Sequence, residues 1–214
     1  MTIKKGVFIS VEGIDGAGKS THIPFMIDYL TKNDIKVVTQ REPGGTPIGE
    51  SLRQILLHAK NLHEITELLL MFASRQELIH NFIVPNLSQG TWVITDRFID
   101  ASVAYQGCGR GIGIDKIYTL KSLLVPQINT DTTFLFDTDL DIAIARLKKH
   151  NRVYDRIESE EQDFFKNVQL AYYDILKNEP QRVKLIKTNR DIASTQNEII
   201  TYLNILIDKF HAKN

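Results

Sequence analysis

The segment from Gly13 to Ser20 constrains the fold of this chain more than any other. It reads G-I-D-G-A-G-K-S and matches the pattern G-x-x-x-x-G-K-[ST] at every fixed position. An apolar run, 6–11, precedes it, and a helical pattern begins near Gly18. Glycines let successive backbone N–H groups turn toward an anion, and the helix that follows adds the positive end of its dipole. The sequence therefore predicts a strand, a phosphate-binding loop and a helix, in that order.

The rest of the chain alternates short apolar runs with helical patterns, which is typical of an α/β fold with a parallel sheet. We predict a P-loop three-layer sandwich, in which helices flank a five-stranded parallel sheet, as a single domain over residues 1–214. Strands are expected at 6–11, 35–40, 91–95, 132–136 and 182–186. Helices are expected at 18–32, 46–58, 61–87, 99–106, 115–124, 139–149, 160–178 and 194–211. Two segments break the pattern, a glycine-rich one at 107–113 and a basic one at 148–156, and we expect a short lid at about 148–158.

Composition excludes several classes of protein. Twenty-six Lys and Arg balance twenty-six Asp and Glu, so no net charge attracts polyanions, and we expect no nucleic-acid partner. The apolar run near the N-terminus is far shorter than the roughly 18–20 residues that span a bilayer, so we expect no membrane anchor. The single cysteine, Cys108, cannot form an internal disulfide. These features predict a cytoplasmic protein with a free thiol.

The phosphate loop predicts binding of a nucleoside triphosphate, but it leaves the reaction open. Lys19 is expected to contact the β- and γ-phosphates, and the Ser20 hydroxyl to reach Mg²⁺. A GTPase, a motor ATPase and a small-molecule kinase all fit. A guanine-specific site usually carries N-K-x-D, which T-N-R-D at 188–191 matches poorly, and motor ATPases are usually larger. A small kinase is therefore the default.

Asp96 and Arg97 follow the third expected strand. A carboxylate at the carboxyl end of a parallel strand can reach the nucleotide's Mg²⁺, because open α/β sheets bind ligands at this edge. The guanidinium of Arg97 can hold a phosphate through two hydrogen bonds. The alternative is a solvated loop pair with no ligand.

Four blocks occur together: G-I-D-G-A-G-K-S-T from residue 13, R-E-P-G-G-T at 41–46, D-R-F-I-D-A-S-V-A-Y-Q-G at 96–107 and D-R-I-E at 155–158. In order and spacing they resemble the bacterial thymidylate kinases, a family of P-loop nucleoside monophosphate kinases. The resemblance implies transfer of the γ-phosphoryl group of ATP to dTMP, with Mg²⁺ as cofactor, by a homodimer that supplies dTDP for dTTP synthesis. A deoxynucleoside kinase or another nucleoside monophosphate kinase on the same fold remains an enzyme alternative, and a slowly hydrolysing nucleotide-binding regulator is the alternative from another class.

The resemblance also implies roles for individual residues. Catalytic roles fall to Lys19, Asp15, Arg97 and Arg152, and metal binding to Ser20 and Asp96. The ATP site comprises Gly13, Ile14, Asp15, Gly16, Ala17, Gly18, Lys19, Ser20, Thr21 and Arg146, the last stacking on adenine. The dTMP site comprises Asp15, Glu42, Pro43, Arg53, Met71, Phe72, Arg75, Arg97, Ser102, Tyr105 and Gln106.

Within the dTMP site, Asp15 is expected to approach the sugar and phosphate, although it could instead be a helix N-cap. Arg97 would hold the phosphate with help from Arg53, which could equally be an ordinary helix residue. Arg75 would donate to thymine O4. Ser102, Tyr105 and Gln106 would line the rest of the pocket, with Tyr105 excluding ribose by its shape.

One position departs from the family pattern. A phenylalanine that stacks on the base usually lies four residues before this arginine, and here that position is Met71. A residue four positions back lies on the same helix face as Arg75, and a methionine sulfur can cover an aromatic ring. Either Met71 covers thymine, or the helix is rotated so that Phe72 does; otherwise Phe72 belongs to the core.

The family divides over the position of its remaining catalytic arginine. One branch carries it in the phosphate loop, where this chain has Gly16 and Ala17, and the other carries it in the lid. Arg152 is the expected catalytic lid arginine and Arg156 the next candidate. Lys148 and Lys149 are instead interpreted as a solvated helix end.

Overall fold

The centre of the molecule is a single five-stranded sheet. The computed structural model describes residues 5–125, 128–148 and 155–212. The strands are β1 (Phe8–Glu12), β2 (Val37–Arg41), β3 (Trp92–Asp96), β4 (Thr132–Asp137) and β5 (Val183–Lys187), in the order β2-β3-β1-β4-β5. Every neighbouring pair is parallel. The predicted fold class is therefore confirmed, and each strand lies within two residues of its expected bounds.

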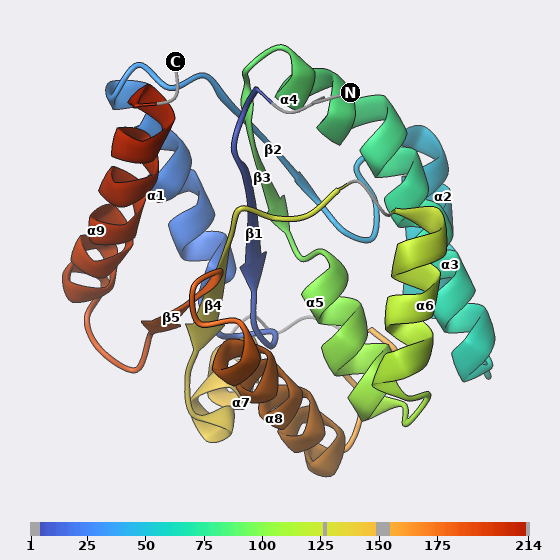
Figure 1. Ribbon diagram of the computed structural model, residues 1–214. Helices are drawn as coiled ribbons and strands as arrows, with labels where there is room; N and C mark the ends of the chain where they lie inside the picture. Colours follow the sequence, from blue (N-terminus) through green and yellow to red (C-terminus); the bar gives the residue numbers. More distant parts are fainter. Residues whose placement is uncertain (1–4, 126–127, 149–154, 213–214) are drawn as a thin grey trace.

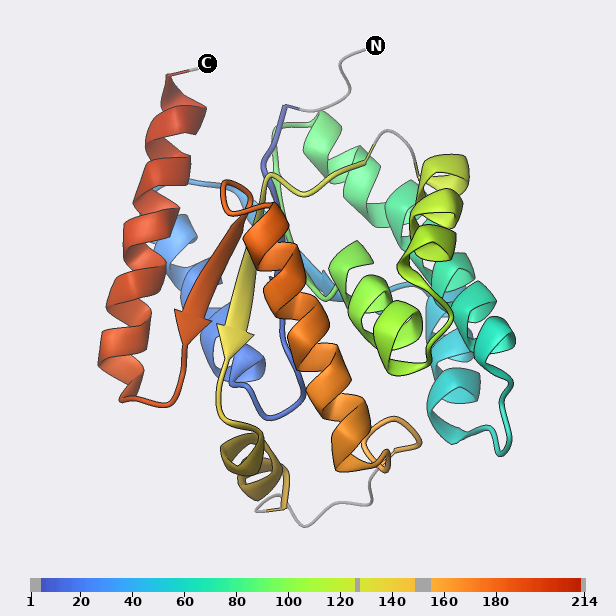
Figure 2. The same cartoon turned by 60° about the horizontal axis from the view of Figure 1, so that its bottom comes forward.

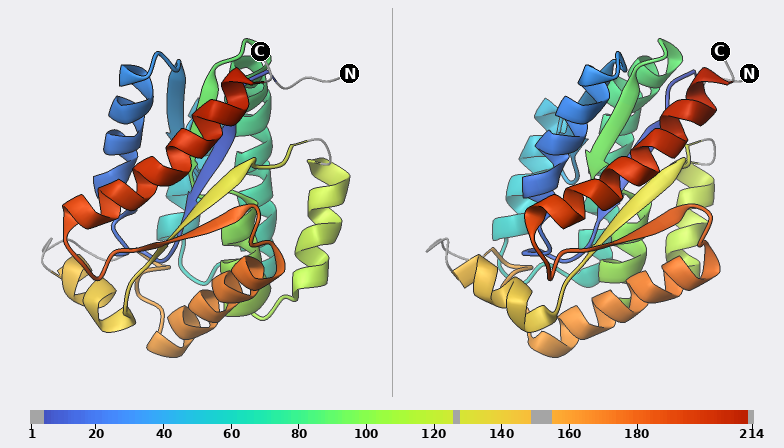
Figure 3. Two further views of the ribbon diagram at one scale, coloured as in Figure 1. Left: turned by 60° about the vertical axis from the view of Figure 1, so that its left-hand side comes forward. Right: turned by 90° about the vertical axis from the view of Figure 1, so that its left-hand side faces the viewer.

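Helices cover both faces of this sheet. On one side, α1 (Lys19–Lys32) packs against α9 (Ile192–His211), and α3 to α6 lie on the other side (Figure 1). The two further views in Figure 3 show the same separation of α9 from α6 by the strands. The remaining bounds are α2 (Pro47–His58), α3 (Glu64–Leu78), α4 (Val84–Ser88), α5 (Ile99–Ser102), α6 (Ile114–Leu124), α7 (Leu140–Lys148) and α8 (Gln162–Asn178). In the described part of the chain, no helix combines the length and apolar character needed to cross a membrane.

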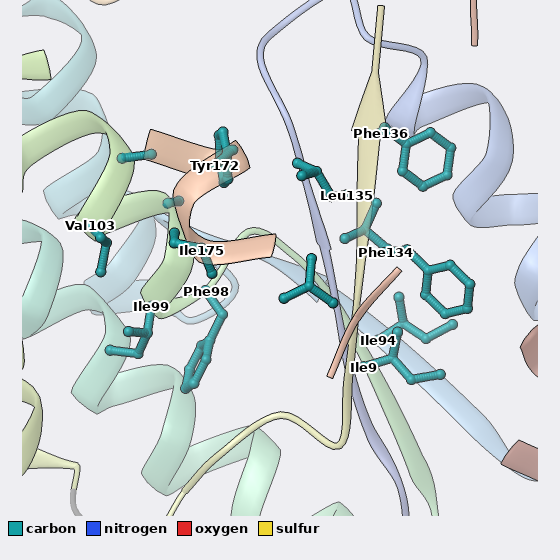
Figure 4. Packing of buried hydrophobic residues seen from close by; sticks show 14 of the residues in the cluster. Ile9, Ile94, Phe98, Ile99, Val103, Phe134, Leu135, Phe136, Tyr172 and Ile175 are labelled. Atoms are coloured by element: carbon teal, nitrogen blue, oxygen red, sulfur yellow. The ribbon is translucent and has the colours of Figure 1, made fainter. Parts of the chain in front are cut away.

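The central strands are buried on both faces, which explains their nearly continuous apolar sequence. All five residues of β1 are buried. Along β4 the side chains alternate: Phe134 and Phe136 point to one side, whereas Leu135 points to the side of Tyr172 (Figure 4). This core fixes the carboxyl ends of β1, β3 and β4, where the sequence places its charged and glycine-rich motifs.

The prediction of a single helix over 61–87 is wrong in detail. The observed helix, α3, begins only at Glu64, and the preceding His63 side chain accepts a hydrogen bond from the backbone N–H of Ile65. After Leu78 the backbone widens into a π-helical segment, η1 (Ile79–Ile83), and α4 follows. Pro85 lies at the start of α4, and a proline can neither donate to the preceding turn nor fit an unbroken α-helix there. The wider turns absorb this defect.

The expected break at 107–113 is also wrong in part. Helix α5 continues into a second π-helical segment, η2 (Val103–Gly109), so the chain is still helical at Gly107 and Gly109. These glycines serve close packing. A Cβ on Gly109 would lie 2.6 Å from the ring of Phe164 in α8, and one on Gly107 would lie 3.3 Å from Ile117 in α6.

Candidate functional site

The phosphate loop joins β1 to α1 in the strand–loop–helix order that the sequence predicts. Gly13, Gly16 and Gly18 all have positive φ angles, of 126°, 82° and 98°. A Cβ on Gly13 would lie 2.2 Å from the carbonyl oxygen of Phe136, and one on Gly16 would lie 2.4 Å from that of Ala143. Only glycine tolerates both the backbone conformation and the contact. The loop is thereby seated against the end of β4 and against α7, which lies beyond the carboxyl end of β4 (Figure 2).

A cavity of about 720 Å³ opens over this loop, within the usual range for small-molecule sites. It is lined by Asp15, Gly16, Gly18, Lys19, Ser20, Thr21, Asp96, Arg146 and Leu147. We call it the donor cavity. The Lys19 ammonium donates to the carbonyl oxygens of Gly13 and Ile14 at 2.9 and 3.0 Å. Burial and the nearby charge of Arg97 lower the pKa of Lys19. The ammonium thus lies against the loop.

Arg146 extends from α7 across the donor cavity. Its guanidinium donates to the carbonyl oxygen of Gly16 at 3.1 Å and to that of Thr188 at 2.6 Å. Thr188 follows β5, so Arg146 ties the phosphate loop to the loop after the last strand. The hydrogen bonds to Gly16 and Thr188 hold the planar guanidinium at the wall of the donor cavity. The expected stacking of Arg146 on adenine stays a prediction.

Asp96 and Ser20 offer oxygen atoms to the donor cavity. Asp96 Oδ1 is buried and has no hydrogen-bond partner among the described residues. Within these residues, no three acidic, histidine or cysteine side chains gather as a metal cluster. Mg²⁺ commonly binds with one or two protein oxygens and completes its shell with phosphates and water. A carboxylate beside a hydroxyl fits that mode.

Arg97 lines a second cavity and bonds to Asp15, which lines the donor cavity. Its φ angle is 72°, which turns the backbone sharply at the end of β3. The guanidinium donates to Asp15 Oδ1 at 2.9 Å and covers the ring of Tyr105 at 4.7 Å. Burial by itself would lower the pKa of Arg97, but Asp15 reverses the effect and the pKa is raised well above its ordinary value. Nη1 is buried and has no hydrogen-bond partner among the described residues.

The second cavity, which we call the acceptor cavity, adjoins the first. Its lining comprises Asp15, Glu42, Pro43, Arg53, Leu57, Met71, Arg97, Ala101, Tyr105, Asp155, Ile157 and Glu158. Asp15 lines both cavities. Arg53 is half-buried and donates to the carbonyl oxygen of Pro43 at 2.9 Å, so it is not an ordinary solvated helix residue. The structure therefore brings most of the residues expected for dTMP around one space.

Met71 and Phe72 have different environments. Met71 lines the acceptor cavity, whereas Phe72 belongs to the hydrophobic core and is only 2% exposed. The guanidinium of Arg75 lies over the Phe72 ring at 4.9 Å. Of the two residues that the sequence left open, only Met71 lines this cavity, and Phe72 is a core residue.

Three of the residues expected for dTMP, Arg75, Ser102 and Gln106, are almost fully buried and are not part of the acceptor-cavity lining. Arg75 donates through Nε to Glu42 at 2.7 Å, through Nη1 to Ser102 at 3.0 Å and through Nη2 to the carbonyl oxygen of Phe98 at 2.9 Å. A guanidinium has five N–H donors, so two remain. Burial raises the pKa of Glu42, and the charge of Arg75 opposes that shift.

Glu12, at the end of β1, was missed from the sequence. It is fully buried and accepts hydrogen bonds from the backbone N–H of Phe98 at 2.7 Å and from the Tyr172 hydroxyl at 2.9 Å. Burial, followed by the charge of Asp100, raises the pKa of Glu12 to about 8. It fixes the backbone immediately after Arg97. The sequence signal that could have found Glu12 was an acidic residue at the end of a largely apolar strand.

Asp155, Ile157 and Glu158, from the D-R-I-E block, were not expected to line the acceptor cavity. Arg156 pairs with the buried Glu67 at 2.8 Å and donates through Nε to the carbonyl oxygen of Leu56 at 3.0 Å. Arg156 is thus held in the structure, which does not favour it as a mobile catalytic arginine. Arg152 lies outside the described residues, as does most of the expected lid.

Comparison with known proteins gives a consistent result. The family model described as thymidylate kinase matches residues 11–199. The chain is 42% identical over 206 residues to a thymidylate kinase of Ruthia magnifica, covering 95% of this chain and all of the relative. It is 48% identical over 197 residues to one of Cupriavidus necator, covering 91% and 96%. The crystal structure of thymidylate kinase from Ehrlichia chaffeensis superposes with a TM-score of 0.76 at 36% identity, covering 93% of this chain and 98% of that one.

Proposed function

Because the chain belongs to the thymidylate kinase family, we propose that it transfers the γ-phosphoryl group of ATP to dTMP, giving dTDP and ADP for dTTP synthesis. The observation that carries the proposal is the meeting of the donor and acceptor cavities at Asp15, with Arg97 beside it. Phosphoryl transfer depends mainly on in-line positioning and on positive charge around the transferring group. Two adjoining cavities with shared charged walls supply that arrangement.

On the donor side, the phosphate loop cradles the triphosphate with its backbone N–H groups, and Lys19 neutralises charge on the β- and γ-phosphates. Ser20 and Asp96 would hold Mg²⁺, which when bound neutralises charge on the same phosphate oxygens. Arg146 borders the adenosine side through its contacts with Gly16 and Thr188. No residue here has to form a covalent bond to the substrate.

On the acceptor side, the free Nη1 of Arg97 holds the dTMP phosphate, and Arg53 adds a second positive charge across the cavity. Glu42 and Pro43 form the turn that borders this phosphate. Asp15 keeps Arg97 in place and accepts from the sugar 3′-hydroxyl. One oxygen of the dTMP phosphate then faces the γ-phosphate of ATP, which is the geometry of direct transfer.

The base of dTMP lies on the α3 side of the acceptor cavity. Met71 covers the thymine ring, and Arg75 donates to O4 with one of its two remaining N–H groups. Ser102 orients Arg75, and Gln106 completes the polar edge. Tyr105, packed beneath Arg97, leaves no space for a 2′-hydroxyl.

We retain three further proposals. The whole chain forms one domain, and its lid spans about 148–158 with Arg152 as the catalytic arginine.

Ile65 and Leu69, one turn apart on α3, are 41% and 52% exposed, and this apolar face would pair two copies as a homodimer. Light scattering of the wild type and of Leu69→Asp tests the dimer: the expected mass halves in the variant. A cytoplasmic location suits the free thiol of Cys108.

A coupled ADP-release assay with ATP, Mg²⁺ and each nucleoside monophosphate in turn tests the main proposal. Turnover with dTMP, weaker with dUMP and absent with AMP, CMP and GMP, is the expected result. Turnover with another monophosphate would keep the phosphate loop and overturn the roles given to Arg75 and Gln106. Binding of ATP without turnover of any monophosphate would favour a nucleotide-binding regulator.

A further inference from the structure

A buried carboxylate, Glu67, lies at the junction of three segments around the acceptor cavity. It belongs to α3 and is only 1% exposed. Its Oε1 accepts from Gln106 Nε2 at 2.7 Å, and its Oε2 accepts from Arg110 Nε at 3.1 Å and lies 2.8 Å from Nη2 of Arg156. The cavity lining does not include Glu67, so it would act on a ligand only through its neighbours.

The contact with Gln106 determines which way the glutamine amide faces. A carboxylate can only accept hydrogen bonds, so the amide must turn its NH₂ group toward Glu67. The amide oxygen then points the other way. Gln106 Oε1 is buried and has no hydrogen-bond partner among the described residues. Ala101 and Tyr105, which line the acceptor cavity, precede Gln106 by five residues and by one on the same helical stretch.

We propose that Glu67 is a specificity-positioning residue, which fixes the Gln106 amide with its oxygen toward the acceptor base and so selects a pyrimidine whose ring nitrogen carries a hydrogen. The inference rests on the proposed function and deepens it. Without the carboxylate, the two ends of the amide are nearly equal in shape, and Gln106 could present either a donor or an acceptor.

The fixed amide of Gln106 and the guanidinium of Arg75 together present one hydrogen-bond acceptor and one donor to the base, in a fixed order. Arg75 can only donate, and it bonds to Ser102, four residues before Gln106 on the same helical stretch. Gln106 held in this way presents an acceptor. Thymine matches both, since O4 accepts and N3–H donates. Cytosine opposes both, because its amino group meets a donor and its bare N3 meets an acceptor. A buried polar site rejects such a mismatch strongly, since the groups on both sides lose their partners.

Two arginines, Arg110 and Arg156, hold Glu67 in place. Arg110 also pairs with Glu160 at 2.6 Å and lies over the ring of Phe164, and Arg156 is anchored to the carbonyl oxygen of Leu56. Breaking a buried pair of this kind is costly, because it strands a charge away from water. The carboxylate therefore has one available position, and the orientation of Gln106 follows from it.

The test compares Glu67→Gln with a matched control, Glu160→Gln, which removes a carboxylate from the same Arg110 without touching Gln106. The measured quantity is the Ki of dCMP, as competitor, divided by the KM for dTMP, with the KM for ATP measured in parallel. We expect this ratio to fall about tenfold or more in Glu67→Gln and to stay at the wild-type value in Glu160→Gln. In a Gln106→Leu background, Glu67→Gln should lower the ratio no further.

A folded Glu67→Gln protein with the wild-type ratio would overturn the inference, and so would an equal fall in Glu160→Gln. If Glu67→Gln does not fold, Glu67→Asp takes its place. The aspartate keeps a carboxylate, but its side chain is one methylene shorter and no longer reaches Gln106. The same fall in the ratio is expected, and an unchanged ratio would again overturn the inference. Failure of the wild type to phosphorylate dTMP is a separate result that would overturn the proposed function and this inference with it.

Discussion

Arg97, which lines the acceptor cavity, donates a hydrogen bond of 2.9 Å to Asp15, which lines both cavities. Asp15 comes from the phosphate loop, whereas Arg97 follows β3, so the contact links segments 82 residues apart. Asp15 also lies 3.7 Å from Lys19. One carboxylate thus pairs with a cation that lines the donor cavity and with a cation that lines the acceptor cavity.

The first prediction concerns this pair. Asp15→Asn should lower kcat about 10²-fold, because Arg97 and Lys19 lose the charge that positions them for the transferring group. Steady-state kinetics with dTMP and ATP measure the effect. Asp28→Asn, on the exposed face of α1 where Asp28 pairs with Lys32, is the control and should leave kcat unchanged. Wild-type kcat in Asp15→Asn would contradict the role of the pair.

The second prediction separates Met71 from Phe72. Met71→Ala should raise the KM for dTMP about tenfold, because it uncovers one face of the thymine ring at the cavity. Phe72→Ala should instead lower the free energy of unfolding by about 3–5 kcal/mol, as expected for a buried core phenylalanine. Kinetics and urea unfolding measure the two effects. Gln76→Ala, at an exposed position of the same helix, should change neither KM nor kcat.

The third prediction concerns the arginine that neutralises charge on the transferring phosphoryl group. Arg152→Ala should lower kcat about 10³-fold and leave dTMP affinity nearly unchanged, because such an arginine acts mainly in the transition state. Lys148→Ala, which changes an exposed residue at the end of α7, is the control and should keep kcat close to the wild-type value. A normal kcat in Arg152→Ala would move the catalytic role to another residue.

The fourth prediction concerns pH. Because the pKa of Glu12 is raised to about 8 in the folded protein, the folded state holds a proton that the unfolded chain has already released above its ordinary pKa of 4.5. The contribution of Glu12 to stability is therefore full below pH 4.5 and is lost as pH rises through 8. Replacing it by glutamine should flatten the fall in the free energy of unfolding between pH 5 and 8. Urea titrations at each pH measure it, and parallel curves for Glu12→Gln and wild type would contradict it.

The sequence predicted the sheet and the phosphate loop well, because both depend on local pattern. Strand β1 is buried on both faces and therefore reads as an apolar run, and Gly13 and Gly16 are required by the backbone conformation itself. The helices were predicted less well. Two of them contain π-helical segments, one just before Pro85 and one in which Gly109 packs closely against Phe164 of α8, and neither feature has a periodicity that a linear pattern displays.

By itself, then, the sequence determined that a nucleotide-binding loop follows the first strand, that Asp96 and Arg97 follow the third, and which family the blocks resemble. Only the tertiary structure decided that Met71 and not Phe72 faces the acceptor cavity, and that Glu12 and Glu67 hold the site from behind. The physical reason is that a motif encodes short-range backbone geometry. The choice between adjacent residues, and the partner of a buried charge, depend on packing between segments far apart in the chain.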